Sequence, residues 1–124
     1  MKLEPAPDIK EIAIMIVNKG IFPNVQIDRI VCMRSREATG RARARIWSFP
    51  KIWQMALNLE AHYVIEVLSQ HFDHLSADDQ TRIIIHELMH IPKNFSGSLV
   101  PHRGQYKQIN TRTVEALFKE MKKR

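Results

Sequence analysis

Residues 76–92, SADDQTRIIIHELMHIP, predict a helix whose start and end are both marked in the sequence. Ser76 is a residue type that caps helix N-termini, and Asp78 and Asp79 place negative charge in the first turn, where the helix dipole favours it. Pro92 cannot continue a helix, so we expect the helix to end at about Ile91.

The flanking sequence predicts two further helices and three strands. Asp8 is a candidate N-cap for a helix over Ile9–Lys19, and the C-terminal segment is expected to be helical from Arg103 onward because its apolar residues follow helical spacing. The strands are expected at Val25–Met33, Arg41–Trp47 and His62–Leu68, with a hairpin connection at Arg34–Gly40 and a short helix within Phe49–Leu57.

This order of elements predicts an α+β fold. We expect a sheet of three strands or slightly more, packed against an N-terminal helix, the helix of residues 76–91 and a C-terminal helix. The chain has 124 residues, of which 44% are hydrophobic, so residues 1–124 are predicted to form one domain with a core of its own.

The composition also limits the surroundings of the protein. No apolar leader follows Met1, no stretch is long and apolar enough to span a membrane, and Cys32 is the single cysteine. We therefore expect a cytoplasmic protein without membrane contact or disulfide. The formal charge of +6 favours acidic partners without identifying one, and the oligomeric state is left open.

Two histidines and a glutamate give the predicted helix a chemical function. His86 and His90 are four residues apart and share one helix face, so their ring nitrogens can converge on one zinc ion. Glu87 follows His86 directly and lies beside the metal, where it can take a proton from a zinc-bound water. The alternative without a metal site is that His86 and His90 are half-buried on an amphipathic helix and that Glu87 is exposed.

A catalytic zinc site usually has a third protein ligand, and His102 is the best candidate. It lies twelve residues beyond His90, and the intervening loop contains Gly97 and can fold back toward the helix. The spacing of metzincins would put the third ligand at Ser96, so that class is excluded.

Two segments together resemble known zinc peptidases. HELMH at residues 86–90 followed by PHRGQY at residues 101–106 resembles the SprT-like minimal zincins, in which HExxH precedes a loop and a Pro-His-Gly-x-x-aromatic segment. The chain is still more similar to metallopeptidases found in archaea and phages, from about Arg34 through ARIW at 44–47 and YVIEVL at 63–68 to Tyr106.

The resemblance implies that His86, His90 and His102 bind one zinc ion and that Glu87 is the general base. Arg103 stands where the SprT-like pattern has glycine directly after the histidine, which offsets the following residues by one. An oxyanion also needs a donor besides zinc, and Tyr106 and Arg103 are the candidates.

A run of arginines raises a second functional hypothesis. The segment alternates arginine with small or apolar residues and continues into Trp47 and Phe49, and such a face can bind phosphates and stack bases. A solvated sheet face and a surface that selects acidic peptides are equally open alternatives. The residues concerned are Arg34, Arg36, Arg41, Arg43 and Arg45.

The sequence therefore favours a zinc-dependent metallopeptidase acting on peptide or protein substrates. The alternatives are a zinc-containing nucleic-acid-binding module with little or no hydrolytic activity, and a zinc hydrolase of non-peptidic substrates. For the peptidase, we expect the substrate to add a strand at a sheet edge, with His62–Leu68 as the candidate edge strand.

Overall fold

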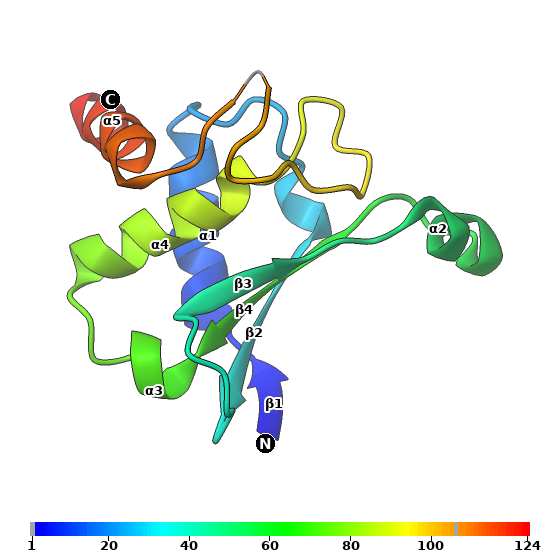
Figure 1. Cartoon of the computed structure of the whole chain (residues 1–124), viewed down its shortest axis with the longest axis horizontal. Helices are drawn as coiled ribbons and strands as arrows, with labels where there is room; N and C mark the ends of the chain where they lie inside the picture. Colours follow the sequence, from blue (N-terminus) through cyan, green and yellow to red (C-terminus); the bar gives the residue numbers. More distant parts are fainter. Residues whose placement is uncertain (1, 106) are drawn as a thin grey trace.

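The computed structural model describes residues 2–105 and 107–124 and confirms the α+β class. A mixed sheet of four strands, in the order β1-β2-β4-β3, is combined with five α-helices (Figure 1). The elements are β1 (Lys2–Pro5), α1 (Pro7–Asn18), the 3-10 helix η1 (Ile27–Arg29), β2 (Ile30–Arg36), β3 (Ala44–Trp47), α2 (Lys51–Leu57), β4 (Tyr63–Leu68), α3 (Ser69–Phe72), α4 (Ala77–Met89) and α5 (Thr111–Lys123).

The middle of the sheet is occupied by β4, which pairs in parallel with β2 and antiparallel with β3. The predicted hairpin at Arg34–Gly40 is therefore wrong, because β2 and β3 are not neighbours and β2 itself continues to Arg36. All residues of β4 except Val64 are buried, and a strand with both faces covered belongs between two others.

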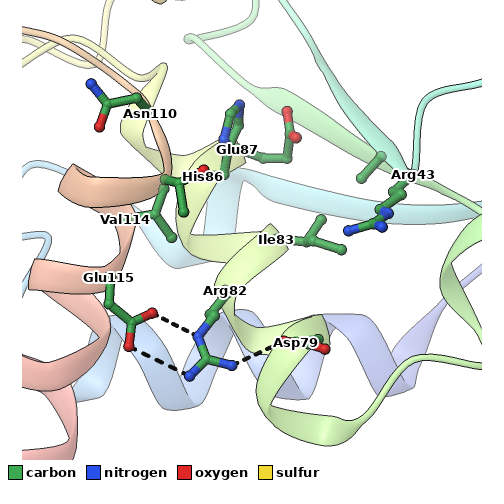
Figure 2. A pocket seen from close by; sticks show the side chains of 11 residues that line it. Arg43, Asp79, Arg82, Ile83, His86, Glu87, Asn110, Val114 and Glu115 are labelled. Atoms are coloured by element: carbon green, nitrogen blue, oxygen red, sulfur yellow. Dashed lines mark hydrogen bonds and ion pairs between the residues drawn. The ribbon is translucent and has the colours of Figure 1, made fainter.

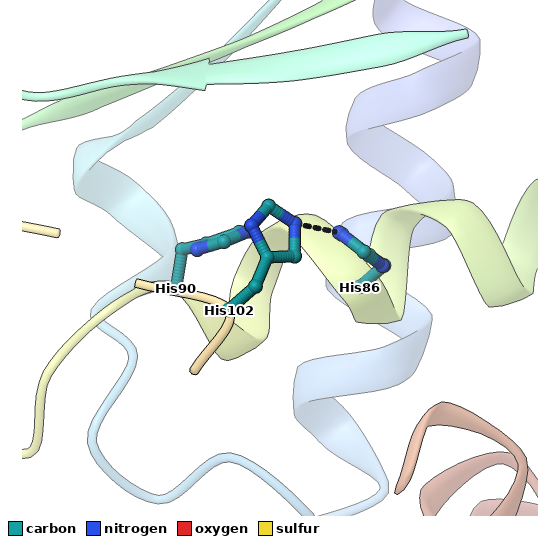
Figure 3. A group of neighbouring side chains, drawn as sticks. All are labelled: His86, His90 and His102. Atoms are coloured by element: carbon teal, nitrogen blue, oxygen red, sulfur yellow. Dashed lines mark hydrogen bonds between the residues drawn. The ribbon is translucent and has the colours of Figure 1, made fainter. Parts of the chain in front are cut away.

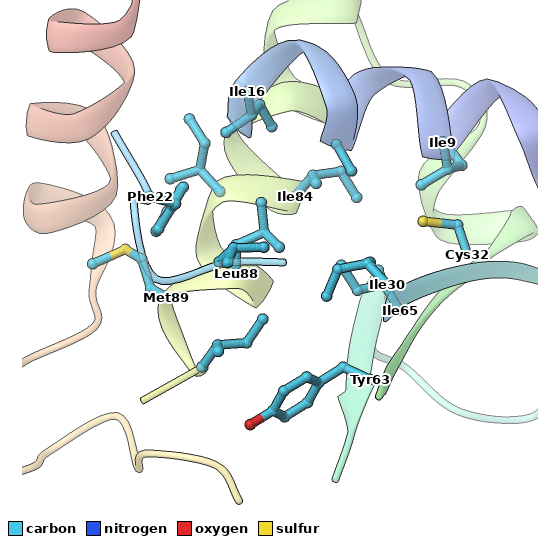
Figure 4. Packing of buried hydrophobic residues seen from close by; sticks show 14 of the residues in the cluster. Ile9, Ile16, Phe22, Ile30, Cys32, Tyr63, Ile65, Ile84, Leu88 and Met89 are labelled. Atoms are coloured by element: carbon cyan, nitrogen blue, oxygen red, sulfur yellow. The ribbon is translucent and has the colours of Figure 1, made fainter. Parts of the chain in front are cut away.

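The core lies between the sheet and the helices α1 and α4, which cover one of its faces (Figure 4). Ile9 and Ile16 of α1 and Ile84 and Leu88 of α4 are fully buried against inward-pointing strand residues such as Ile65. Cys32 belongs to this cluster, as expected for a cysteine on an apolar strand.

The helix α4 forms where the sequence predicts it. The Ser76 hydroxyl accepts a hydrogen bond from the backbone N–H of Asp79 at 3.1 Å, and the last helical residue is Met89. The first turn of α4 is polar. From Thr81 onward most of its side chains are buried.

The starts of the other two predicted helices need correction. The first helix begins at Pro7, with Ala6 as N-cap, because proline suits the first helical position and the Asp8 carboxylate is instead paired with Arg34. The last helix begins at Thr111, not Arg103, because the Asn110 side chain accepts from the N–H of Thr113 in a capping box.

The helix α2 extends away from the sheet, and the side chain of Gln54 connects it to the rest of the domain. Gln54, its one buried residue, donates hydrogen bonds to the carbonyl oxygens of Phe49 and Ser96, both at 2.8 Å. The N–H of Phe49 donates to the carbonyl of Gly97 at 2.7 Å. Gly97 has φ +95°, and a Cβ there would lie 2.2 Å from the Phe49 oxygen, so only glycine fits.

Among the described residues, no helix combines the length and the apolar character that crossing a membrane requires.

Candidate metal centre

Three histidine side chains converge beside the C-terminal turn of α4 (Figure 3). His86 lies on α4, His90 is its C-cap, and His102 comes from the following loop. One ring nitrogen from each lies within 4.8 Å of the other two, and the Nε2 atoms of His86 and His102 are 3.1 Å apart. The structure thus brings together the three residues that the sequence singles out as ligands.

The loop between α4 and α5 is fastened to His90, which places His102. The N–H of Val100 donates to the carbonyl of His90 at 2.8 Å, and His90 Nδ1 is 2.6 Å from the Val100 carbonyl. A nitrogen facing a carbonyl carries the proton, so His90 Nδ1 donates and Nε2 presents its lone pair. The Ile109 N–H bonds to the His102 carbonyl at 2.9 Å and holds the loop on its other side.

The electrostatics at His86 and His90 favour neutral imidazoles. Burial, then the neighbouring His90 and His102, lower the pKa of His86 to about 4. Burial is also the main cause that lowers the pKa of His90. A neutral imidazole is the form that binds a metal ion.

The donor set and its spacing fit a metal ion. Zinc–nitrogen bonds of about 2.0–2.1 Å in a tetrahedron put two ligand nitrogens about 3.3 Å apart, close to the 3.1 Å between His86 and His102. Three imidazoles leave one tetrahedral position for water or substrate.

Glu87 lies next to the three histidines in a shallow cavity between α4 and β3. The cavity has a volume of about 390 Å³, and Ala44 and Ile46 of β3 line it together with the three histidines and Glu87. Glu87 is 7% exposed, and burial raises the pKa of its carboxyl to about 7. A carboxyl with this pKa can both accept and return a proton near neutral pH. This excludes the alternative in which Glu87 is a solvated residue.

The candidate oxyanion donors lie next to His102 in the sequence. Arg103 is exposed and forms an isolated bridge with Gln108, whereas Tyr106 lies outside the described residues. A residue that the sequence did not indicate is Lys107, whose half-buried ammonium group is close enough to His90 to lower the pKa of that histidine. No local motif marks this lysine, because the loop alone brings it to the centre.

The free sheet edge near this centre is β3, not the segment His62–Leu68. That segment forms β4, whose two edges are already paired with β2 and β3, so the prediction of an edge strand there is wrong. The outer edge of β3 runs past the cavity that holds Glu87.

The arginine segment does not form one continuous basic face. Arg34 is paired with Asp8 and Asp73, and Arg36 with Glu4. Arg45 is paired with Glu66 at 3.2 Å and lies over the Trp47 ring. Arg41 and Arg43 are exposed and precede β3. Because three of the five guanidinium groups are neutralised within the fold, the nucleic-acid-binding alternative is not favoured.

Comparison with known proteins agrees with this geometry. No curated protein and no solved structure matches the chain. A family described as "Putative phage metallopeptidase" matches residues 1–122, nearly the entire length. The chain therefore belongs to this phage metallopeptidase family.

Proposed function

We propose that the protein is a zinc-dependent peptidase in which His86, His90 and His102 hold one zinc ion. The convergence of their ring nitrogens within 4.8 Å carries the proposal. Zinc is favoured over harder cations because all three donors are imidazole nitrogens. When bound, zinc acts as a Lewis acid that polarises a carbonyl and makes water more acidic.

Glu87 is the general base in this proposal. Its buried carboxylate takes a proton from the attacking water and later delivers that proton to the leaving amine. Glu87 follows His86 on α4, so its carboxyl lies beside the proposed ligands. It is not itself a ligand in this proposal. The exposed Arg103 and the half-buried Lys107 are the described cations nearest in sequence to His102, and either can supply a positive charge to an oxyanion.

The substrate is a peptide that extends the sheet at β3. This strand leaves its outer backbone groups unpaired within the described sheet, and its inward side chains Ala44 and Ile46 line the cavity of Glu87. An added strand would thus be held by backbone hydrogen bonds with one of its peptide bonds beside the histidines.

The substitution Glu87→Gln tests the mechanism. It keeps the shape of the side chain and leaves the three histidines in place, so we expect full zinc content and loss of peptide hydrolysis by at least about 100-fold. Zinc is measured by elemental analysis, and hydrolysis by mass spectrometry of a peptide library. The matched control is Glu11→Gln, an exposed residue of α1, which should retain both properties. Unchanged hydrolysis by Glu87→Gln would exclude Glu87 as the base.

A further inference from the structure

A second cavity opens directly beside Glu87 and His86. It has a volume of about 530 Å³ and lies between α4, the start of α5 and the beginning of β3 (Figure 2). Ile83, Val114 and Ala44 provide apolar wall. Because Glu87 and His86 line this cavity as well as the metal centre, a side chain next to the bond being cut can enter it.

The two carboxylates on one wall of this cavity share a single cation, Arg82. The Arg82 guanidinium donates to Glu115 at 2.8 Å and to Asp79 at 2.9 Å, as Figure 2 shows, and it lies 4.2 Å from the Phe118 ring centre. Both carboxylates are therefore hydrogen-bonded to one guanidinium group, and this wall keeps one net negative charge on the side away from Arg43.

Unlike Arg82, Arg43 has no carboxylate partner among the described residues. Its side chain is exposed, lines the same cavity near Ile83, and has no ion pair with any residue that the structure describes. Its backbone is fixed, because its carbonyl accepts the N–H of Leu68 at 2.9 Å. The cavity thus combines apolar wall with one uncompensated guanidinium group.

We propose that this cavity is a specificity pocket for an acidic side chain, and that Arg43 is the residue that selects it. This inference rests on the proposed peptidase function. The methylene groups of a glutamate or aspartate that flanks the scissile bond contact Ile83 and Val114, while its carboxylate accepts hydrogen bonds from Arg43. A basic side chain in the same position would be repelled by the charge of Arg43.

The experiment compares two peptides that differ only by glutamate or glutamine beside the cleaved bond. We expect the wild type to cleave the glutamate peptide with a kcat/KM about 10-fold higher or more, the effect of one charge-assisted contact. Arg43→Gln should abolish this preference, so that the ratio of the two kcat/KM values falls to about 1. Arg43→Glu should favour a peptide with lysine at the same position.

Arg41→Gln is the matched control, since it removes the same charge from the same segment without lining the cavity in the described structure. It should keep the preference for glutamate. Thermal unfolding of each variant shows that the exposed substitutions leave the fold intact.

A second readout uses binding in place of turnover. On the Glu87→Gln protein, calorimetry should show tighter binding of the glutamate peptide, and Arg43→Gln should remove the difference. If the wild type cleaves both peptides but its preference for glutamate is absent or survives in Arg43→Gln, this inference is wrong and the proposed function still holds. If no peptide is cleaved by the zinc-loaded wild type, the proposed function fails first.

Discussion

His90 shows how a single residue can connect the metal centre to the loop that completes it. Its backbone carbonyl accepts the N–H of Val100, and its ring Nδ1 donates to the carbonyl of the same residue. Two of the three proposed ligands therefore belong to one hydrogen-bonded unit, with His102 two residues beyond Val100. This orients the His90 ring without relying on the metal ion.

His102→Ala tests whether the loop supplies a ligand. The side chain is exposed, so we expect an unchanged unfolding temperature of the metal-free protein but a loss of zinc affinity greater than about 100-fold, beyond the effect of losing an outer hydrogen-bond partner. Competition with a chromophoric chelator measures the affinity. The exposed His74, which lies outside the cluster, provides the control His74→Ala. Normal zinc binding by His102→Ala would show that the third ligand is another residue.

At the scale of elements, α2 is attached to the metal-binding loop through Gln54. Ile52 and Met55 on the same helix are 73% and 72% exposed, whereas Gln54 is 8% exposed and bonds to Phe49 and Ser96. The Gln54 amide thus joins α2 to the loop before His102, beside the bond from the N–H of Phe49 to the carbonyl of Gly97.

We expect Gln54→Ala to lower the free energy of unfolding by about 1–3 kcal/mol, because two carbonyl oxygens would lose their donor. The zinc affinity should fall as well, since the loop loses a contact upstream of His102. Urea unfolding and chelator competition measure the two effects. Met55→Ala, one residue along and exposed, should change stability by less than about 0.5 kcal/mol. Equal effects of the two substitutions would contradict a holding role for Gln54.

The sequence predicts α4 well because every signal for that helix is local. Ser76, the acidic first turn and Pro92 act within a few residues of the helix itself. Strand order is not a local property, so the place of β4 between β2 and β3 could not be read from its composition alone. The strand β1 was missed for the same reason, since four residues without an apolar alternation gain their structure from pairing with β2.

In the candidate metal centre, too, the sequence predicts what depends on local spacing and misses what depends on packing. His86, Glu87 and His90 are fixed by helix periodicity, and the short loop limited the choice of a third ligand. The pocket at Arg43 and the approach of Lys107 to His90 depend on how β3, α5 and the loop pack around α4, which no spacing encodes.

At the scale of the whole molecule, the two faces of the sheet differ: α1 and α4 pack on one, whereas the other exposes large hydrophobic side chains. Eight of the eleven large hydrophobic side chains that are exposed in the described structure belong to this face or to the region of α2: Leu3, Val31, Trp47, Ile52, Trp53, Met55, Leu57 and Leu59. Stability therefore depends on the other face, where α1 and α4 pack, and on the charged contacts that fasten α1 to the sheet.

The main charged contact of this kind predicts how the molecule responds to acid. Arg34 bonds to Asp8 of α1, and this hydrogen bond lowers the pKa of Asp8 below its ordinary value of 3.8. Because the pKa is lower in the folded state, the contribution of Asp8 is complete above about pH 4 and is lost as the pH falls through the folded-state value.

Asp8→Asn should therefore lower the free energy of unfolding at pH 7 by about 0.2–1 kcal/mol, the usual range for an exposed ion pair. The difference from the wild type should shrink as the pH falls below 4. Urea unfolding at pH 7, 4 and 3 measures this. The exposed carboxylate of Asp28, changed to Asn, serves as the control. A difference that persists undiminished at pH 3 would show that Asp8 stabilises α1 by a contact other than its charge.

The unpaired edge of β3 also bears on how copies of the protein avoid one another. An open strand edge invites another copy to pair with it, which leads to aggregation. Here the edge is only four residues long, Pro50 follows it closely, and the exposed Arg41 and Arg43 precede it. Two copies that paired in parallel along this edge would bring like charges together, whereas an acidic peptide meets no such repulsion. We therefore expect these arginines to favour an acidic ligand at the edge over a second copy of the protein.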